Sequence, residues 1–181
     1  RQHGLENEVL EINSKAVEIA KEARRMTGQH IWIAGTVGPS GKTLSPVGTV
    51  SNNQIREAFR EQIQALSSSG VDLLILETFT GLREIKEAIA SAKSVTDIPI
   101  IALLTFTEEA ITLEGETPQE VVSALTNLDV ASIGANCSVG PTPMVRVLEE
   151  MATHTTIPLT AMPNAGFPTY IDGRFVYMSS P

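Results

Sequence analysis

The sequence predicts an α/β fold built on a parallel sheet, and three observations support this. Apolar runs of strand length alternate along the chain with segments whose apolar residues recur at helical spacing. Successive units follow one another at intervals of about thirty residues, which suits parallel strands joined by crossover helices. No internal repeat or low-complexity linker interrupts the series. We therefore expect residues 1–181 to form a single domain.

Each expected element has a local signal in the sequence. Helices show apolar residues three and four positions apart, and strands are apolar runs bounded by Gly, Pro or polar residues. Two helices are expected to open with capping boxes, at Ser51 and at Thr117, and a third to have Thr142 as its N-cap. The expected strands are 31–36, 71–78, 98–105, 130–137 and 157–166. The expected helices run from Leu5 until Gly28, from about Gln54 to Ser67, over 82–92, from Thr117 onward and over 142–152.

Two architectures fit this order of elements: an open doubly wound sheet, or part of a (β/α)8 barrel. The run VDLLILET at 71–78 is continuously apolar until its end, which is typical of a parallel strand buried on both faces. Periodicity does not choose between the two folds. In both, binding and chemistry gather at the carboxyl ends of the strands.

Bulk composition excludes several classes of function. The 181-residue chain has a formal net charge of −8 and no run of Lys or Arg, which argues against nucleic acid or an anionic membrane as the main partner. No apolar run reaches the length of a membrane span, and no signal-peptide pattern opens the sequence. A single cysteine excludes an internal disulfide and suits the cytoplasm. We expect a small-molecule partner.

The stretch AGTVGPSGKT at residues 34–43 approaches the spacing of a phosphate-binding loop. Gly41 and Lys42 fit that pattern, but Thr36 occupies the position of the first glycine and Pro39 removes a backbone N–H. The following residues, LSPVGTVSNN, contain helix breakers where a phosphate-binding loop would run into a helix. We therefore expect a rigid loop that closes the end of a strand.

Polar residues at the expected strand ends are the candidates for chemistry. Glu77 closes a buried strand, and burying a carboxylate is costly unless a ligand cation, a backbone N–H pair or a protein cation satisfies it. Cys137 lies between a strand and a helix N-terminus, where a thiolate is favoured, although a lone cysteine also occurs as a small buried apolar residue. Asn164 fits a turn as well as a site. The candidates are Thr36, Gly38, Glu77, Thr78, Thr105, Thr107, Asn136, Cys137 and Asn164.

Four motifs occur together, in one order and at characteristic separations: AGTVGPSGK, DLLILETFTGLREIKEAI, IGANCSVGP and MPNAGFP. Together they resemble the homocysteine S-methyltransferase family, over nearly the whole chain. The tail PTYIDGRFVYMSSP is most similar to bacterial members that are fused to a methylenetetrahydrofolate reductase module. The resemblance implies a (β/α)8 barrel, of which this chain would supply about five βα units in the central part. The first two strands and the last strand are then expected to lie outside it.

The resemblance also implies a zinc site and a substrate site. Zinc in the family is held by three cysteines, of which Cys137 matches one, while the adjacent pair on the final strand is absent from this sequence. Glu77 matches the glutamate that binds the ammonium group of homocysteine, and Thr78, Asn136 and Gly38 are expected beside the substrate. Asn164 matches an asparagine that occupies the open zinc position when substrate is absent. It is therefore expected as a displaceable ligand.

These implications give a leading function and two alternatives. The leading one is zinc-dependent transfer of a methyl group to the thiol of homocysteine, giving methionine, with a methyl donor that the sequence does not specify. The first alternative is a non-catalytic fragment that binds substrate weakly or is purely structural, because one thiolate cannot hold catalytic zinc. The second is a different barrel enzyme with Cys137 as a covalent nucleophile. By itself, the chain is expected to be inactive.

Overall fold

The computed structural model describes residues 4–166 and 168–177, and residues 178–181 of the tail motif lie outside it. Its contacts divide the chain into two compact units. The first comprises the residues up to Leu76 together with Lys86–Ile100, and the second comprises Glu77–Ile85 together with the residues from Ile101 onward. Two strands and one helix are divided between the units, so the organisation as a single domain stays a prediction.

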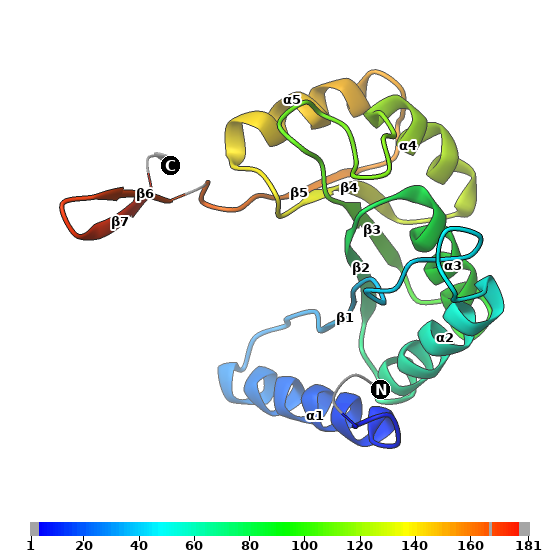
Figure 1. Ribbon diagram of the computed structural model, residues 1–181. Coiled ribbons are helices and arrows are strands. Elements are labelled where there is room, and N and C mark those ends of the chain that lie inside the picture. Colours follow the sequence, from blue (N-terminus) through cyan, green and yellow to red (C-terminus); the bar gives the residue numbers. More distant parts are fainter. Residues whose placement is uncertain (1–3, 167, 178–181) are drawn as a thin grey trace. The chain divides into compact units, whose positions relative to one another are not determined.

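The α/β prediction is confirmed by a five-stranded sheet in the described residues (Figure 1). Each strand pairs with the next one along the chain, in the order β1-β2-β3-β4-β5, and a helix follows each of the first four strands. The pairs β1 with β2, β3 with β4, and β4 with β5 are all parallel. The strands are β1 (Ala34–Val37), β2 (Leu73–Phe79), β3 (Ile100–Leu104), β4 (Ser132–Asn136) and β5 (Leu159–Met162).

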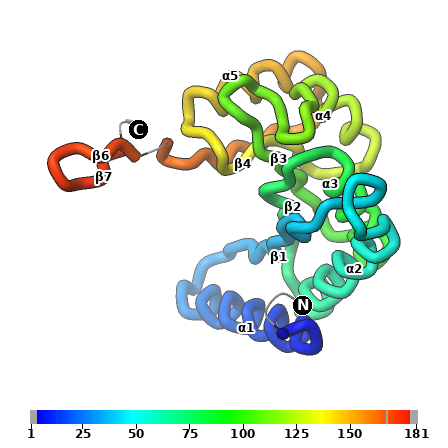
Figure 2. The backbone as a smooth tube through the Cα atoms, in the orientation of Figure 1, coloured from blue at the N-terminus to red at the C-terminus, as the bar shows by residue number. Residues whose placement is uncertain are grey.

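The helices fall where apolar periodicity predicts them, and the tube in Figure 2 shows their alternation with the strands along the chain. They are α1 (Val9–Thr27), α2 (Asn52–Ser68), α3 (Leu82–Lys93), α4 (Pro118–Leu125) with a following 3₁₀ turn η1 (Thr126–Leu128), and α5 (Pro141–Ala152). Gly28 ends α1 in a left-handed conformation, as expected, whereas the helix begins at Val9 rather than at Leu5. Within the described residues, no helix is both long enough and apolar enough to cross a membrane.

Two of the three expected N-caps are confirmed. The Ser51 hydroxyl accepts from the Gln54 N–H, the Thr117 hydroxyl accepts from the Glu120 N–H, and both form complete capping boxes. The third expectation is wrong, because α5 begins before Thr142 and its N-cap is Gly140. Pro141 takes the first position of α5, where a proline needs no N–H partner and its fixed φ suits the helix.

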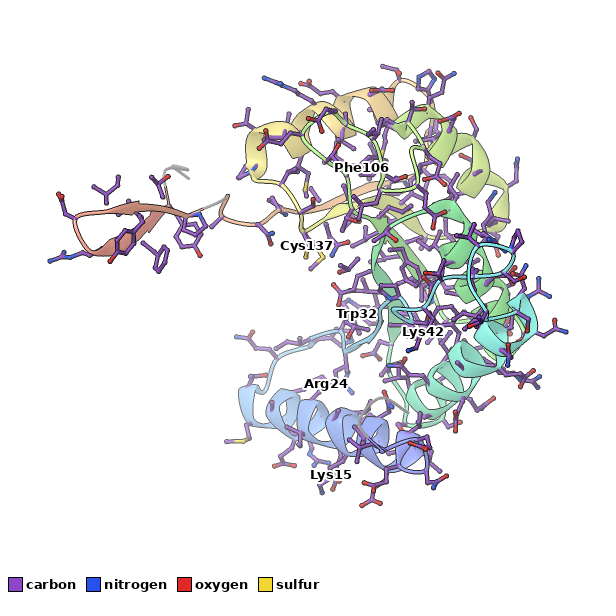
Figure 3. The ribbon with its side chains drawn as sticks, in the orientation of Figure 1. Lys15, Arg24, Trp32, Lys42, Phe106 and Cys137 are labelled. Carbon is purple, nitrogen blue, oxygen red and sulfur yellow. The ribbon has the colours of Figure 1, made fainter. Side chains whose placement is uncertain are left out.

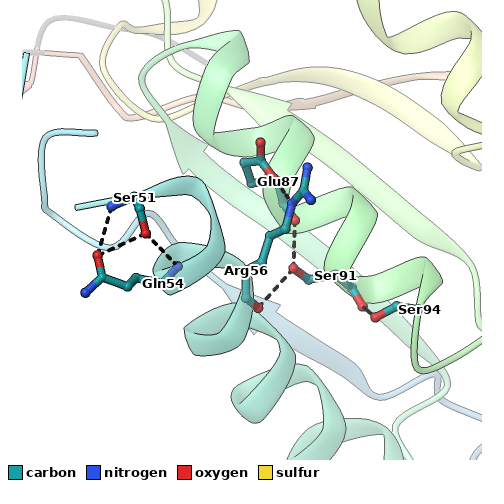
Figure 4. Close-up of polar contacts among 6 residues, drawn as sticks. All are labelled: Ser51, Gln54, Arg56, Glu87, Ser91 and Ser94. Carbon is teal, nitrogen blue, oxygen red and sulfur yellow. Dashed lines mark hydrogen bonds and ion pairs between the residues drawn. The ribbon is translucent and has the colours of Figure 1, made fainter. Parts of the chain in front are cut away.

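The first unit has an apolar core between its helices and its strands. Its buried residues include Val17 of α1, Phe59 and Ile63 of α2, and Leu74 and Leu76 of β2. A polar contact joins α2 to α3 beside this core (Figure 4). There Arg56 pairs with the Glu87 carboxylate, while the Ser91 hydroxyl donates to the Arg56 carbonyl over 3.1 Å.

The second unit packs α5 against β4 and β5 and also against α4. Every residue of β4 is buried, and the helices contribute apolar side chains with at most 2% exposure. These side chains are Val121, Val122, Leu125, Met144, Val147 and Met151. Gly134 in the middle of β4 is required by close approach, because a Cβ there would collide with the backbone of Thr160 in β5.

Strand β2 differs from the prediction of burial on both faces. Leu74 and Leu76 are fully buried, whereas Leu73, Ile75 and Glu77, which alternate with them, are only partly buried. The pattern alternates because the described residues cover one face of this strand completely and the other only partly. Glu77 therefore lies on the more accessible face.

A two-stranded antiparallel hairpin follows the sheet and was not expected. Its strands are β6 (Pro168–Ile171) and β7 (Arg174–Tyr177), and all of their residues are exposed. Asp172 and Gly173, which join the strands, both have positive φ, as a two-residue hairpin turn requires. The Asp-Gly pair between apolar residues was the sequence signal for this hairpin.

Asp72, just before β2, ties three segments of the first unit together. Its carboxylate accepts from the Ile33 N–H over 2.7 Å and pairs with Arg24 of α1 over 2.8 Å. The Ile33 hydrogen bond, with the nearby Arg24 charge, lowers the pKa of Asp72. The carboxylate thus fixes the start of β1 relative to α1.

Removal of the Thr117 cap should destabilise the chain, whereas the same change at Thr142 should not. We expect Thr117→Ala to lower the free energy of unfolding by about 1 kcal/mol, because the Glu120 N–H loses its partner. Thr142→Ala should change it by less than about 0.5 kcal/mol, because this residue caps nothing. Urea denaturation of both variants measures the difference, and equal losses would contradict these cap assignments.

Acid should remove the contribution of Asp72 to stability. A carboxyl whose pKa is lower in the folded state stabilises the fold above its unfolded pKa, about 3.9 for Asp, and that stabilisation is lost as the pH falls through the folded pKa. We expect Asp72→Ala to cost about 1 kcal/mol at pH 7, a low value because Arg24 and Asp72 are 32% and 25% exposed. The difference between wild type and variant should shrink below pH 4. A difference that is constant from pH 7 to pH 3 would refute the charge contribution.

Candidate functional site

The segment after β1 does not have the geometry of a phosphate-binding loop. Helix α2 begins only at Asn52, so the chain does not pass directly from the glycines into a helix. The segment instead closes on itself, because Leu44 is buried and bridges Val50, and the Ser45 N–H donates to the Val50 carbonyl over 2.8 Å. Lys42, labelled in Figure 3, is exposed. Gly38 begins this segment, in the first unit.

Glu77 and Thr78 lie within the last three residues of β2, as the expected strand at 71–78 implies. The Glu77 side chain is partly buried, and its carboxylate has no hydrogen-bond or salt-bridge partner among the described residues. A carboxylate in that position loses hydration without gaining a protein partner. It is therefore available to a cationic or hydrogen-bonding ligand.

Asn136, the last residue of β4, connects β2 with the turn that follows β4. Its side chain is 1% exposed. The amide oxygen accepts from the Thr78 N–H over 2.8 Å, and the amide nitrogen donates to the Thr78 hydroxyl over 2.9 Å and to the Cys137 Sγ over 3.2 Å. Both donors of this buried amide are therefore used within the protein.

The turn after β4 presents Cys137, which is partly exposed and lies at the carboxyl end of β4 (Figure 3). The Cys137 N–H donates to the Met162 carbonyl over 2.9 Å, and the Asn164 N–H donates to the Val139 carbonyl over 3.2 Å. These two bonds hold the ends of β4 and β5 together. They place the backbone of Asn164 beside the turn that carries the thiol.

Backbone strain is concentrated at the same strand ends. Thr78, Cys137 and Ser138 have φ values of 64°, 55° and 58°. A left-handed conformation is uncommon for residues other than glycine and is an outlier for a β-branched residue such as Thr78. Such strain persists only where the surrounding contacts hold it, and it occurs preferentially at functional sites.

Sequence reasoning missed a carboxylate that caps the start of α3. Glu116, in the loop before α4, accepts from the Leu82 N–H over 3.1 Å and so caps the N-terminus of α3. Glu116 also pairs with the Thr112 hydroxyl. Burial raises the pKa of neighbouring Glu114, and the Glu116 charge raises it further. The only sequence signal was the concentration of acidic residues in this loop, which does not indicate a partner.

The other threonine candidates differ in how their hydroxyl groups are satisfied. The Thr105 hydroxyl and N–H both contact the Phe79 carbonyl, at 3.3 and 2.9 Å, so they fix the pairing of β3 with β2. The Thr107 N–H donates to the Ile111 carbonyl within its own loop, whereas its buried hydroxyl has no hydrogen-bond partner among the described residues. Side-chain hydrogen bonds join Thr78, Asn136 and Cys137 in one network, which does not include Gly38 or Thr36.

The donor set fits a metal only in part. Cys137 is the single cysteine of the chain, and among the described residues no three Cys, His, Asp or Glu side chains gather at one place. A structural or catalytic zinc needs about four ligands, of which at least three come from the protein. Cys137 is positioned to supply one ligand, and the described residues do not complete the set.

The fold and these strand ends define a parallel α/β protein with a candidate site at the carboxyl edge of its sheet. The sequence profile of the homocysteine S-methyltransferase family matches residues 1–181. The chain therefore belongs to this family.

Individual relatives agree with this assignment. The methionine synthase of Mycobacterium tuberculosis (strain ATCC 25618 / H37Rv) is 28% identical over 174 residues, which are 92% of this chain and 14% of that protein. The methionine synthase of Mycobacterium leprae (strain TN) is 30% identical over 142 residues, 76% of this chain and 12% of that protein. This chain thus spans a small part of these relatives.

Solved structures show the same fold. The homocysteine methyltransferase MmuM from Escherichia coli superposes with a TM-score of 0.74 in its apo form and 0.76 in its metallated form, at 24% identity. The match covers 85% and 87% of this chain, and 59% of the other chain in each case.

Two glutamates of the second unit should differ in their effect on stability. We expect Glu77→Gln to change the free energy of unfolding by less than about 0.5 kcal/mol, because its carboxylate has no partner among the described residues. Glu116→Ala should cost about 1 to 2 kcal/mol, because the Leu82 N–H and the Thr112 hydroxyl lose their acceptor. Thermal or urea unfolding compares the two. A larger loss for Glu77→Gln than for Glu116→Ala would mean that Glu77 is a structural residue.

Proposed function

We propose that this chain is part of an enzyme that transfers a methyl group to the thiol of homocysteine, forming methionine. Membership of the family supports the reaction class. The observation that carries the proposal is the partly buried Glu77 carboxylate, which has no partner among the described residues. Glu77 is next to Thr78 in the chain, and the Asn136 amide hydrogen-bonds both Thr78 and Cys137. The site thus offers a negative charge and a thiol on neighbouring parts of one hydrogen-bonded network.

We assign Glu77 to the ammonium group of homocysteine. A carboxylate and an ammonium form a charge-assisted hydrogen bond, which is stronger where both groups are withdrawn from water. The partial burial of Glu77 and its lack of a protein partner suit this role. Thr78 and Gly38 are proposed beside the substrate, and so is Asn136.

We assign Cys137 to a zinc ion, with Asn164 as a ligand that substrate displaces. A bound zinc would supply a deprotonated, nucleophilic substrate sulfur at neutral pH, where a free thiol is mostly protonated. The backbone of Asn164 is tied to the turn that carries Cys137, and its side chain has no partner among the described residues. Because the described residues do not complete a ligand set, the remaining ligands are proposed to come from outside them.

A (β/α)8 barrel is the proposed architecture of the complete catalytic unit. In the described residues, β1 and β5 each have one neighbouring strand, so each leaves one edge unpaired. Unpaired edges promote association with other strands. Thr36 of β1 and Met162 of β5 are exposed, and Leu73 and Ile75 of β2 are only partly covered. Further βα units would pair with both edges and cover these side chains.

The cellular setting follows from the same proposal. A single cysteine that serves as a metal ligand must remain reduced, and this suits the cytoplasm. The methyl donor would be bound outside the described residues. A fused methylenetetrahydrofolate reductase module is the proposed partner for this step.

The alternative is a non-catalytic chain that binds substrate weakly or is purely structural. It is favoured by one observation: within the described part of the chain, no three Cys, His, Asp or Glu side chains gather at one place. The zinc dependence of homocysteine binding distinguishes the two functions, because only the enzyme requires the metal for that binding. For residues 1–181 in isolation, we expect weak zinc binding and no methyl transfer.

The test is calorimetric titration of the intact protein with homocysteine, with zinc and with a chelator. Glu77→Gln should weaken homocysteine binding at least about tenfold, or 1.4 kcal/mol, because the ammonium loses a charged partner. Binding of 4-mercaptobutyrate, which has the same thiol but no amino group, should not change. Glu61→Gln is the matched control, since Glu61 is an exposed residue of α2.

Three results would contradict the proposal. Homocysteine binding that is indifferent to a chelator favours the non-catalytic alternative. An equal loss of affinity for both ligands in Glu77→Gln removes the assigned role of this carboxylate. A tight one-to-one zinc complex of isolated residues 1–181 contradicts the assignment of the remaining zinc ligands to other residues, because this chain has a single thiol.

A further inference from the structure

The Asn136 side chain is more deeply buried than its neighbours in the site. It is 1% exposed, whereas Glu77, Thr78 and Cys137 are all partly exposed. A buried amide must satisfy its donors and its acceptor, or it destabilises the fold. Asn136 satisfies both donors and its oxygen with Thr78 and Cys137 alone. A ligand could therefore contact the Asn136 nitrogen only if one of these donor bonds broke. It could contact the Asn136 oxygen only as a second donor to that atom.

Two of these bonds hold a strained residue. Thr78 is β-branched and has φ 64°, a conformation that its backbone does not adopt without support. The Asn136 oxygen accepts from its N–H and the Asn136 nitrogen donates to its hydroxyl. The amide therefore fixes both the backbone and the side chain of Thr78, and through them it orients the preceding residue of β2, Glu77.

The third bond reaches the thiol. The Asn136 nitrogen donates to Cys137 Sγ over 3.2 Å, and the Cys137 backbone is anchored by the Met162 carbonyl over 2.9 Å. Strand β3 lies between β2 and β4 in the sheet, so Thr78 and Asn136 are not paired by the backbone ladder. The hydrogen bonds of the Asn136 amide join the end of β2 to the Cys137 turn.

We propose that Asn136 is a positioning residue that sets the separation between the Glu77 carboxylate and the Cys137 thiol, and so selects ligands by the spacing between their amino and sulfur groups. This inference rests on the proposed function for the identity of the ligand, a short amino thiol. It replaces direct substrate contact by Asn136 with an indirect role through Thr78 and Cys137. A ligand that uses only one of the two groups should be insensitive to Asn136.

The first experiment does not depend on any ligand. Backbone hydrogen exchange at Thr78 should accelerate about 10- to 100-fold in Asn136→Ala, because that N–H loses its buried acceptor. Exchange at Leu74 and Leu76 in the same strand should stay as in wild type. Asn13→Ala is the matched control, since it removes an amide that donates to the Val9 carbonyl within α1. It should leave exchange at Thr78 unchanged.

The second experiment compares two ligands in the intact protein with zinc present. Asn136→Ala should raise the Kd of homocysteine about 10- to 100-fold, the range found when outer groups that orient a site are removed. The Kd of 4-mercaptobutyrate should not change. If Asn136→Ala does not fold, Thr78→Val removes the hydroxyl acceptor while keeping a β-branched side chain, and it should produce a smaller loss with the same ligand dependence.

The outcomes separate this inference from the proposed function. Unchanged exchange at Thr78 overturns the bridge itself. Equal losses of affinity for both ligands overturn positioning, because they indicate a contact or a damaged site. If wild type binds no homocysteine while exchange responds as expected, the proposed function and the selection of amino thiols both fail, and the bridge is supported as a purely structural feature.

Discussion

The described structure depends on the pairing of parallel strands, which brings their carboxyl ends to one edge of the sheet. Residues far apart in the sequence become neighbours there: β2 ends at Phe79, and Asn136, which ends β4, contacts Thr78. Parallel strands have this property because each crossover helix returns the chain from the carboxyl ends of the strands to their amino ends before the next strand begins. Polar groups at the carboxyl edge are less costly than in the sheet centre, provided that they find partners.

The partners at this edge come from different sources. Asn136 is fully buried and is satisfied by protein groups, Glu116 caps the N-terminus of α3, and Glu77 has no partner among the described residues. Asn136 and Glu116 have structural roles: the first is a buried amide satisfied by protein groups, and the second is an acceptor for a helix N-terminal N–H. Glu77 differs because its partial burial is not compensated by a protein partner within the described part of the chain.

Some features followed from local sequence and others did not. The capping boxes at Ser51 and Thr117 were predictable because hydroxyl and carboxamide or carboxylate groups three residues apart satisfy helix N–H groups locally. Thr142 was predicted as a cap in the same way, but the chain context placed Gly140 there instead. The accessible face of β2 could not be predicted, since a continuous apolar run does not reveal which of its faces is covered.

The sequence by itself determined the α/β class, the order of strands and helices, and the residues at the strand ends, because these depend on periodicity and on short-range hydrogen bonding. Four motifs in register were also sufficient to identify the family, which the profile match confirms. Only the tertiary structure decided that the Asn136 amide spans from β2 to Cys137 and that Thr78 is held in a left-handed conformation. These features join residues 58 positions apart in the sequence, and no local pattern encodes such a contact.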